Sequence, residues 1–232
     1  MIHKLLSWTK SLNDHPRKFQ LELAIHPLLN GKIIINYPGV DGSIDGYNNK
    51  YKTLAEHIVS QKLASVVRLP NPFTPGLGWS MNLRKVLEYV LKNSKEICGD
   101  TKPEIYLMGL SAGAGAIATL AWEYPQITKV LLLEPALITY EEVTQKMLGN
   151  YKGEVYIVVG SGGDALGKVF GEIFLEGSVK ASRKEFYIIP NCDHSFKGEI
   201  NGRIFSQAPF YAFSDDPKPV FPDKRGGIKL YD

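Results

Sequence analysis

Short, continuous apolar runs alternate with amphipathic segments along most of the chain. The runs are rich in Val, Ile and Leu and lack polar residues at every second position, which is typical of strands covered by helices on both faces. Repeated strand-then-helix units of this kind predict an α/β fold with a doubly wound, mostly parallel sheet. About seven strands are expected, over residues 18–25, 32–37, 64–69, 104–108, 129–133, 155–159 and 185–189.

Amphipathic segments between these runs predict the helices, and one turn signal predicts an antiparallel pair. Asn30-Gly31 separates the first two strands, and Asn-Gly is a strong signal for a tight reversal. We therefore expect residues 18–25 and 32–37 to pair antiparallel, so that the first strand runs against the others. The helices are expected over residues 51–62, 80–97, 112–123, 140–149 and 165–175.

The pattern changes after a core that spans about residues 18–207. Residues 208–232 are rich in proline and aromatic side chains, and we expect an irregular C-terminal arm there. Its aromatic residues are expected to pack onto the domain surface, and a role in binding a partner stays open. A length of 232 residues fits a single domain over 1–232. The aromatic residues in question are Phe210, Tyr211, Phe213 and Phe221.

The composition and charge of the chain limit the classes of partner that we expect. The net charge is only +3, and Lys and Arg are scattered, so we expect neither a nucleic acid nor a membrane surface as partner. Met1–Lys10 holds only a short apolar pair, much less than a secretory signal requires. Cys98 and Cys192 form no disulfide framework and no metal or redox motif. These features favour a cytoplasmic protein, and they leave its oligomeric state open.

A G-x-S-x-G motif, Gly109-Leu110-Ser111-Ala112-Gly113, directly follows the expected strand 104–108. A small-residue helix follows it, which is the strand–turn–helix setting of a nucleophile elbow. Glycines flank the serine in such a turn because a side chain there would meet the neighbouring strand or helix. Ser111 is therefore the candidate nucleophile. A tightly packed turn or a phosphate-binding loop would have the same short motif.

A serine nucleophile needs a general base, and the chain offers five histidines. His194 alone follows an expected strand on its carboxyl side, in the segment IIPNCDHSF. A parallel sheet would bring this loop beside the elbow, so His194 is the candidate base. An isolated surface histidine is the simpler interpretation of the same position.

The base needs a carboxylate that accepts its Nδ1–H and stabilises the imidazolium. Asp164 follows the expected strand 155–159 in a glycine-rich loop, which leaves room for the carboxylate to reach the base. It is our candidate acid, although an aspartate there also suits a helix N-cap. Glu134, after the preceding strand 129–133, is the alternative acid.

The order Ser111, Asp164, His194, each just beyond an expected parallel strand, is that of the α/β hydrolases. On these residues the chain resembles that superfamily from about residue 18 to residue 207, and it looks most like small carboxylesterases and dienelactone-hydrolase-like proteins. It has serine where dienelactone hydrolases have cysteine.

The resemblance implies an oxyanion hole made of two backbone N–H groups. One belongs to Ala112, the residue after the nucleophile, and the other to Val40, in the loop after strand 32–37. Many members have His-Gly before that second donor, whereas this chain has Pro38-Gly39. The substitution keeps the turn and the donor, and a plain Pro-Gly turn is the simpler interpretation.

The resemblance also bears on access to the site. Lid domains are commonly inserted after the strand that here ends near residue 133, and only about twenty residues separate it from strand 155–159. We therefore expect no lid domain. Phe73 and Trp79, in the segment NPFTPGLGW, are candidates to line an apolar substrate pocket, or simply to anchor the loop.

These residues predict an enzyme, a serine hydrolase that cleaves a small-molecule ester or thioester through an acyl-enzyme intermediate. No metal or organic cofactor is expected, because the chain has no metal-ligand spacing and no dinucleotide motif. Three alternatives stay open: an acyltransferase or a cofactor-free haloperoxidase with the same triad, and a silent binding protein on the same fold. The natural substrate is not encoded in any local pattern.

Overall fold

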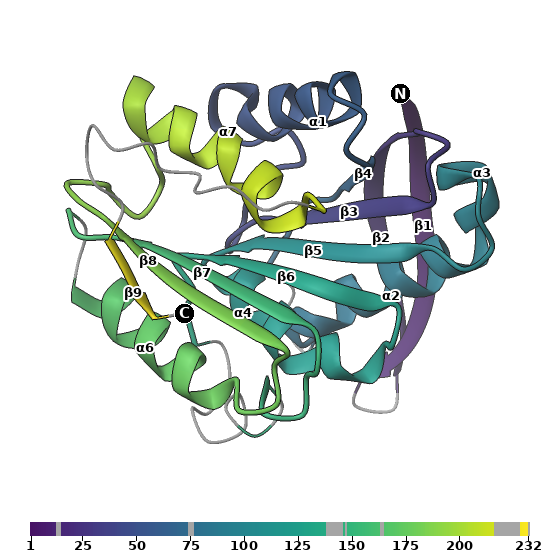
Figure 1. The fold of residues 1–232 in the computed structure, drawn as a ribbon. Coiled ribbons are helices and arrows are strands. Elements are labelled where there is room, and N and C mark those ends of the chain that lie inside the picture. The colour runs from purple at the N-terminus through teal and green to yellow at the C-terminus, as the bar shows by residue number, and fades with distance from the viewer. Residues whose placement is uncertain are drawn as a thin grey trace.

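A single mixed sheet forms the framework of the computed structural model (Figure 1), which describes residues 1–12, 15–73, 77–137, 146, 148–162, 165–215 and 228–231. In this part of the chain the sheet has nine strands in the order β1-β2-β4-β3-β5-β6-β7-β8-β9. The strands are β1 (Ile2–Leu12), β2 (His15–His26), β3 (Lys32–Tyr37), β4 (Ser65–Arg68), β5 (Glu104–Leu110), β6 (Ile127–Leu133), β7 (Glu154–Gly160), β8 (Arg183–Ile189) and β9 (Ile228–Tyr231).

The centre of the sheet is parallel and its edges are antiparallel. Strands β4, β3, β5, β6, β7 and β8 pair in parallel, while β1 and β2 at one edge and β9 at the other pair antiparallel. All seven expected strands are present, and the expectation of a mostly parallel sheet with an antiparallel first edge is confirmed.

The expected pairing of residues 18–25 with residues 32–37 is wrong. β2 runs antiparallel to β3, but β4 lies between them and pairs with both. The chain does reverse at Gly31, where φ is 77°, a value that favours glycine. The turn therefore sets the direction of β3, whereas the neighbour of β3 is set by the crossover through α1 (Lys50–Ser60), which returns β4 to the inner side.

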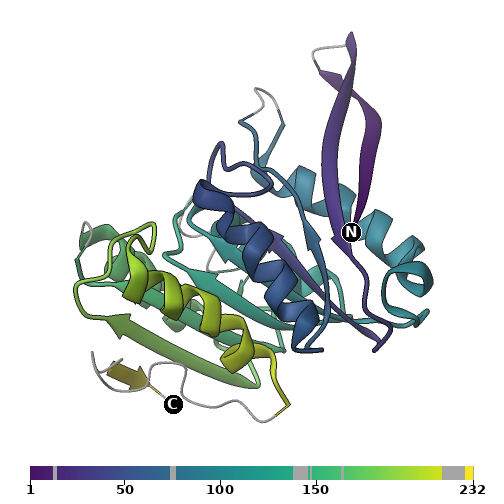
Figure 2. The same cartoon turned by 90° about the horizontal axis from the view of Figure 1, so that it is seen from above.

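Helices cover both faces of the sheet (Figure 1). α1 and α7 lie side by side on one face, and α2, α3, α4 and α6 lie on the other (Figures 1 and 2). The expected helix over 80–97 is divided at Asn93, and most of the expected helix over 140–149 lies outside the described residues. The remaining bounds are α2 (Trp79–Lys92), α3 (Ser94–Cys98), α4 (Ala112–Leu120), α6 (Ala165–Gly177) and α7 (Glu199–Phe213), with single 3-10 turns at Tyr47–Asn49 and Ala121–Glu123.

Each central strand supplies side chains to two cores. In β3, Ile33 and Ile35 pack in the core beneath α2 and α4, while Ile34 packs in the core beneath α1 and α7. All three side chains are fully buried. Because successive side chains of a strand point to opposite faces, a strand buried on both faces must be apolar at every position. This explains the uninterrupted apolar runs in the sequence.

The C-terminal arm is not irregular at its start, so that part of the expectation is wrong. Helix α7 continues through Phe213, with Tyr211 and Phe213 buried against the sheet and Phe210 partly buried. Pro209 lies inside the helix, and this proline among aromatics led to the expectation of irregular structure. The buried positions nevertheless recur at helical spacing, and that periodicity is the stronger signal. Phe221 lies outside the described residues.

Strand β1 was not expected from the sequence. It pairs with β2 along its whole length, and the two form a long hairpin that projects beyond the helical layers (Figure 2). Most side chains of β1 are exposed, and Trp8 stacks on Phe19 of β2. Because β1 contributes little to the core, its sequence lacks the apolar run that marks the central strands.

The connection after β6, where no lid domain was expected, is short. Only residues 134–153 connect β6 to β7, too few for an inserted domain. Among the described residues, no helix has both the length and the apolarity needed to cross a membrane.

Candidate active site

Three residues that carry chemistry lie at the carboxyl ends of three parallel strands. Ser111 follows β5, Glu134 follows β6, and His194 is in the loop after β8. The carboxyl ends of parallel strands share one edge of the sheet, where ligands of open α/β sheets bind. Ser111 and His194 line one pocket there, and Glu134 lies behind the histidine.

Ser111 occupies a strained turn between β5 and α4. Its φ is 56° and its ψ is −123°, a conformation that residues with a side chain seldom adopt. Its N–H donates to the carbonyl of Leu133, and its carbonyl accepts from Gly115 and Ala136, so the turn is anchored to β6 and α4. The strain holds the hydroxyl at the edge of the sheet, as expected for a nucleophile elbow.

The glycines of the motif are required by close backbone contacts. A Cβ on Gly113 would lie 2.3 Å from the carbonyl oxygen of Tyr37 and 2.4 Å from that of Pro38. A Cβ on Gly109 would lie 2.7 Å from the backbone nitrogen of Ala114. These distances are too short for any side chain, so the glycines let α4 pack directly against the end of β3. The sequence pattern thus reflects a steric need on both sides of Ser111.

The loop after β3 passes directly beside the serine. A Cβ on Gly39 would lie 3.2 Å from the Cβ of Ser111, so this backbone is in contact with the nucleophile. Val40, the next residue, lines the same pocket. Ala112 begins α4, and the first N–H groups of a helix have no partner within the helix. Val40 and Ala112 therefore both lie close to Ser111, and their role as oxyanion donors stays a prediction.

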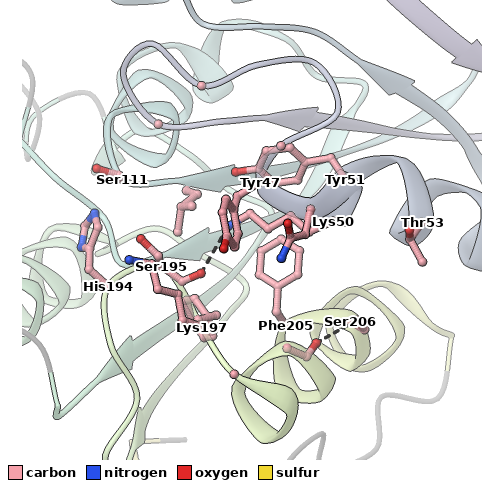
Figure 3. Close-up of a pocket in the computed structure, with 18 of the residues that line it drawn as sticks. Tyr47, Lys50, Tyr51, Thr53, Ser111, His194, Ser195, Lys197, Phe205 and Ser206 are labelled. Atoms are coloured by element: carbon pink, nitrogen blue, oxygen red, sulfur yellow. Dashed lines mark hydrogen bonds between the residues drawn. The ribbon is translucent and has the colours of Figure 1, made fainter.

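His194 faces a buried carboxylate. Its Nδ1 lies 3.6 Å from Oε2 of Glu134, a separation within ion-pair range but longer than a hydrogen bond. The Glu134 side chain is 3% exposed and that of His194 is 44% exposed. The ring therefore has its Nδ1 side toward the protein interior, and in Figure 3 the imidazole lies beside Ser111 at one end of the pocket. Catalytic hydrogen bonds are often long without substrate and shorten when it binds.

Backbone groups hold the Glu134 carboxylate in place. Its Oε1 accepts a hydrogen bond from the N–H of Gly160, at the end of β7. A Cβ on Gly167, in the first turn of α6, would lie 2.2 Å from Oε2, so only glycine leaves space for the carboxylate there. Glu134 itself has a φ of 43°, which turns its side chain under the histidine loop.

The pocket beside these residues has a volume of about 1090 Å³. Its other wall comes from the loop after β3, from α1 and from α7 (Figure 3). Sequence reasoning missed these residues because it looked only at positions directly after strands. They come from α1, from α7 and from loops, and no local sequence pattern says that these segments border one pocket. The main additions are Tyr47, Lys50, Tyr51, Lys197 and Phe205.

Of the other residues predicted for the site, only Phe73 has a side chain that the structure describes. Phe73 is 59% exposed, is not among the residues lining this pocket, and donates its backbone N–H to Asp41, which fits the anchoring role. Trp79 begins α2, but its side chain is outside the described part of the structure. Asp164 also lies outside the described residues, so its distance from His194 is not part of this geometry.

Comparison with known proteins gives a clear result for the fold only. No protein-family model and no curated protein sequence matches the chain significantly. Among solved structures, a dienelactone hydrolase from Anabaena variabilis superposes with a TM-score of 0.66 at 16% identity, covering 91% of this chain and 99% of the other. Est1E from Butyrivibrio proteoclasticus superposes with a TM-score of 0.65 at 13% identity, covering 87% and 95%. A homologue of α/β serine hydrolases from Coxiella burnetii gives 0.57 at 19% identity, covering 82% and 89%.

These likenesses extend over most of both chains in each pair. The parallel centre of the sheet, its antiparallel first edge and the strand–turn–helix at Ser111 agree with the expectation drawn from the sequence. The chain therefore has the α/β-hydrolase fold.

Proposed function

We propose that the protein is a serine hydrolase that cleaves a carboxylic ester or thioester. The observation that carries the proposal is the alignment of three groups: Ser111 on a strained turn, His194 beside it in the same pocket, and the buried Glu134 carboxylate behind Nδ1 of the imidazole. A nucleophile, a base and an orienting acid at one end of a pocket are what acyl transfer through a serine requires.

The proposed reaction has two stages. His194 takes the proton of Ser111 as the hydroxyl attacks the ester carbonyl, and the N–H groups of Val40 and Ala112 stabilise the oxyanion. The imidazolium then gives its proton to the departing alcohol or thiol, which leaves an acyl-enzyme on Ser111. A water molecule activated by His194 releases the acid and restores the serine.

We assign the orienting acid to Glu134, in place of the sequence-based candidate Asp164. Glu134 supports this assignment by its burial, its bond to the N–H of Gly160 and its approach to Nδ1 of His194. A carboxylate there favours the tautomer that leaves Nε2 free to accept the serine proton. Asp164 is the alternative.

The structural neighbours favour ester bonds over other acyl substrates. Proteins that share this fold are described as a dienelactone hydrolase, an arylesterase and carboxylesterases. Fold alone does not determine chemistry, so these neighbours support the proposal only together with the site itself.

The test is the loss of serine chemistry in the Ser111→Ala variant. We expect the native protein to react with a fluorophosphonate probe and to hydrolyse a p-nitrophenyl ester within a series of increasing acyl length. Ser111→Ala should abolish labelling and lower turnover by several orders of magnitude, with an unchanged melting temperature. Ser60→Ala, a serine at the end of α1, is the matched control and should keep both activities. Full turnover in folded Ser111→Ala would exclude the serine mechanism.

A further inference from the structure

Lys50 lies in the pocket and forms no ion pair with any residue that the structure describes. Lys50 is the first residue of α1, and its Nζ donates a hydrogen bond of 3.2 Å to the carbonyl of Ser195, the residue after His194. Figure 3 shows the side chain extending along the pocket toward this loop. The charged end of Lys50 is therefore anchored close to the proposed base.

Aromatic rings enclose the Lys50 ammonium. Its Nζ lies 5.1 Å from the ring centroid of Tyr51 and 5.0 Å from that of Phe205. Contacts of this kind favour a cation and remove it from water. Within the described residues, no carboxylate lies at ion-pair distance from Lys50, although a lysine ammonium has three N–H donors and only one is used by Ser195. Two donors therefore remain for a ligand in the pocket.

Two acidic side chains of this region interact with other groups. Oδ1 of Asp193 accepts the backbone N–H groups of Ser195 and Lys197, and Glu199 forms an ion pair with Arg203 in α7. Burial lowers the pKa of Lys50, the Asp193 charge opposes this effect, and the Lys197 charge adds to it.

Lys197 adds a second positive charge to the same wall. Its side chain is exposed, and no ion pair of this residue is found among the described residues. Val40 and the two lysines line one pocket, and the two positive charges favour a negatively charged ligand there.

We propose that the substrate carries a second, anionic group, a carboxylate or a phosphate, which binds the Lys50 ammonium while Ser111 attacks the ester carbonyl. The inference rests on the proposed function and adds the substrate class. A charge-assisted hydrogen bond to an ammonium in a partly dry pocket is stronger than one between neutral groups. The anion would thus offset the burial of Lys50 and fix the position of the ester.

The kinetic test compares matched anionic and neutral esters. Monoethyl succinate, glutarate and adipate are compared with ethyl butanoate, pentanoate and hexanoate, with product acids measured by chromatography. We expect kcat/KM to be at least about tenfold higher for the best monoethyl ester of a dicarboxylic acid than for its neutral partner, on the order of one charged hydrogen bond. Lys50→Met should remove this preference, mainly by raising KM for the anionic esters. Lys52→Met, on the same helix but outside the pocket lining, is the control and should keep the preference.

A binding test separates this inference from the proposed hydrolysis. Glutarate and inorganic phosphate are titrated by calorimetry into Ser111→Ala and into Ser111→Ala combined with Lys50→Met. Binding of either anion that is lost with Lys50 supports the proposal and identifies the anion, even if no ester is turned over. Equal binding to both proteins, or binding of neither anion, overturns it. Turnover of neutral esters without any preference for anionic ones would also overturn it while leaving the serine mechanism in place.

Discussion

Glu134 lies where three backbone features leave space for a carboxylate. The positive φ of Glu134 directs the side chain under His194, Gly160 supplies an N–H donor, and Gly167 has no side chain to block it. A buried carboxylate is costly unless it is hydrogen-bonded, and the N–H of Gly160 meets that condition here. At the scale of single residues, the proposed mechanism depends on this carboxylate to orient His194.

The first prediction decides between the two acids. Glu134→Gln should lower kcat by up to about 10⁴-fold, because an amide presents N–H where His194 needs an acceptor and favours the wrong tautomer. Asp164→Asn should be much milder. Steady-state rates must be compared with melting temperatures, since loss of a helix cap at Asp164 would cost about 1 kcal/mol. An inactive, folded Asp164→Asn together with an active Glu134→Gln would identify Asp164 as the orienting acid.

The second prediction moves the carboxylate without removing it. In Gly167→Ala the new Cβ would lie 2.2 Å from Oε2 of Glu134, and the flexible end of that side chain is what must shift. We expect a folded protein with kcat lowered by about 10²-fold, since a displacement of about 1 Å can cost that much. Gly78→Ala, where nothing lies within 4 Å of the new Cβ, is the control and should keep its rate. A fully active Gly167→Ala would argue against Glu134 as the orienting acid.

Local sequence patterns predict some of these residues and not others. Ser111 directly follows β5 and His194 is in the loop after β8, so a motif and a strand end were enough to predict that both lie at one edge of the sheet, where they line one pocket. Glu134 and Asp164 follow neighbouring parallel strands, and one-dimensional sequence does not say which side chain reaches the base. Lys50 reaches the site from the far end of a loop, on a helix whose pattern predicts packing but not the pocket it borders.

At the scale of elements, the contact of α4 with the end of β3 keeps Ser111 next to the loop that follows β3. Gly113 makes this contact through backbone atoms alone, against the carbonyls of Tyr37 and Pro38. Neither carbonyl can move without moving β3. The spacing of α4 and β3 therefore depends on Gly113 having no side chain.

The third prediction tests this spacing. Gly113→Ala should lower the free energy of unfolding by about 2 kcal/mol or more, because the new Cβ meets backbone that cannot yield. Gly202→Ala is the matched helical control: it lies in α7 with nothing within 4 Å, and it should raise stability by about 0.5–1 kcal/mol through helix propensity. Urea denaturation of both variants measures the difference. Equal stabilities would mean that α4 shifts freely away from β3.

How well an element could be predicted depended on how deeply it is buried. The central strands were found because burial on both faces demands apolar runs. β1 was missed because the hairpin exposes most of it, and α7 was missed because Pro209 and its aromatic neighbours obscured a helical period. The Asn30-Gly31 turn gave the direction of β3 correctly, but adjacency in a sheet depends on crossovers that no short segment encodes.

At the scale of the whole molecule, one buried polar junction joins the N-terminal hairpin to the parallel sheet. Arg68, at the end of β4, donates from Nε and Nη2 to Nε2 of His26, at the end of β2, and each distance is 3.2 Å. It also pairs with Asp45, in the loop that borders the pocket. Both His26 and Arg68 are buried, and burial together with the Arg68 charge lowers the pKa of His26 from 6.5 to about 4.

The fourth prediction follows from this pKa. His26 is neutral in the folded state, whereas in the unfolded chain it takes up a proton below about pH 6.5. Acid therefore favours unfolding as pH falls from about 6.5 to about 4, with a total effect of about 3 kcal/mol, and the penalty is absent above that window. Denaturation at about pH 7.5 and about pH 5 should show a loss about 2 kcal/mol larger in the native protein than in His26→Asn. Equal losses in the two proteins would contradict a depressed pKa at His26.

The order of the strands along the chain also has a consequence for the synthesis of the protein. Ser111, Glu134 and His194 follow β5, β6 and β8, so the three groups come from successive parts of the growing chain. Synthesis releases the N-terminal part first, and a chain that ends before β8 has the serine without the histidine. Under the proposed mechanism such a chain has no general base and therefore no ester turnover. Ester turnover, measured during refolding, would then report the moment at which the loop after β8 reaches Ser111.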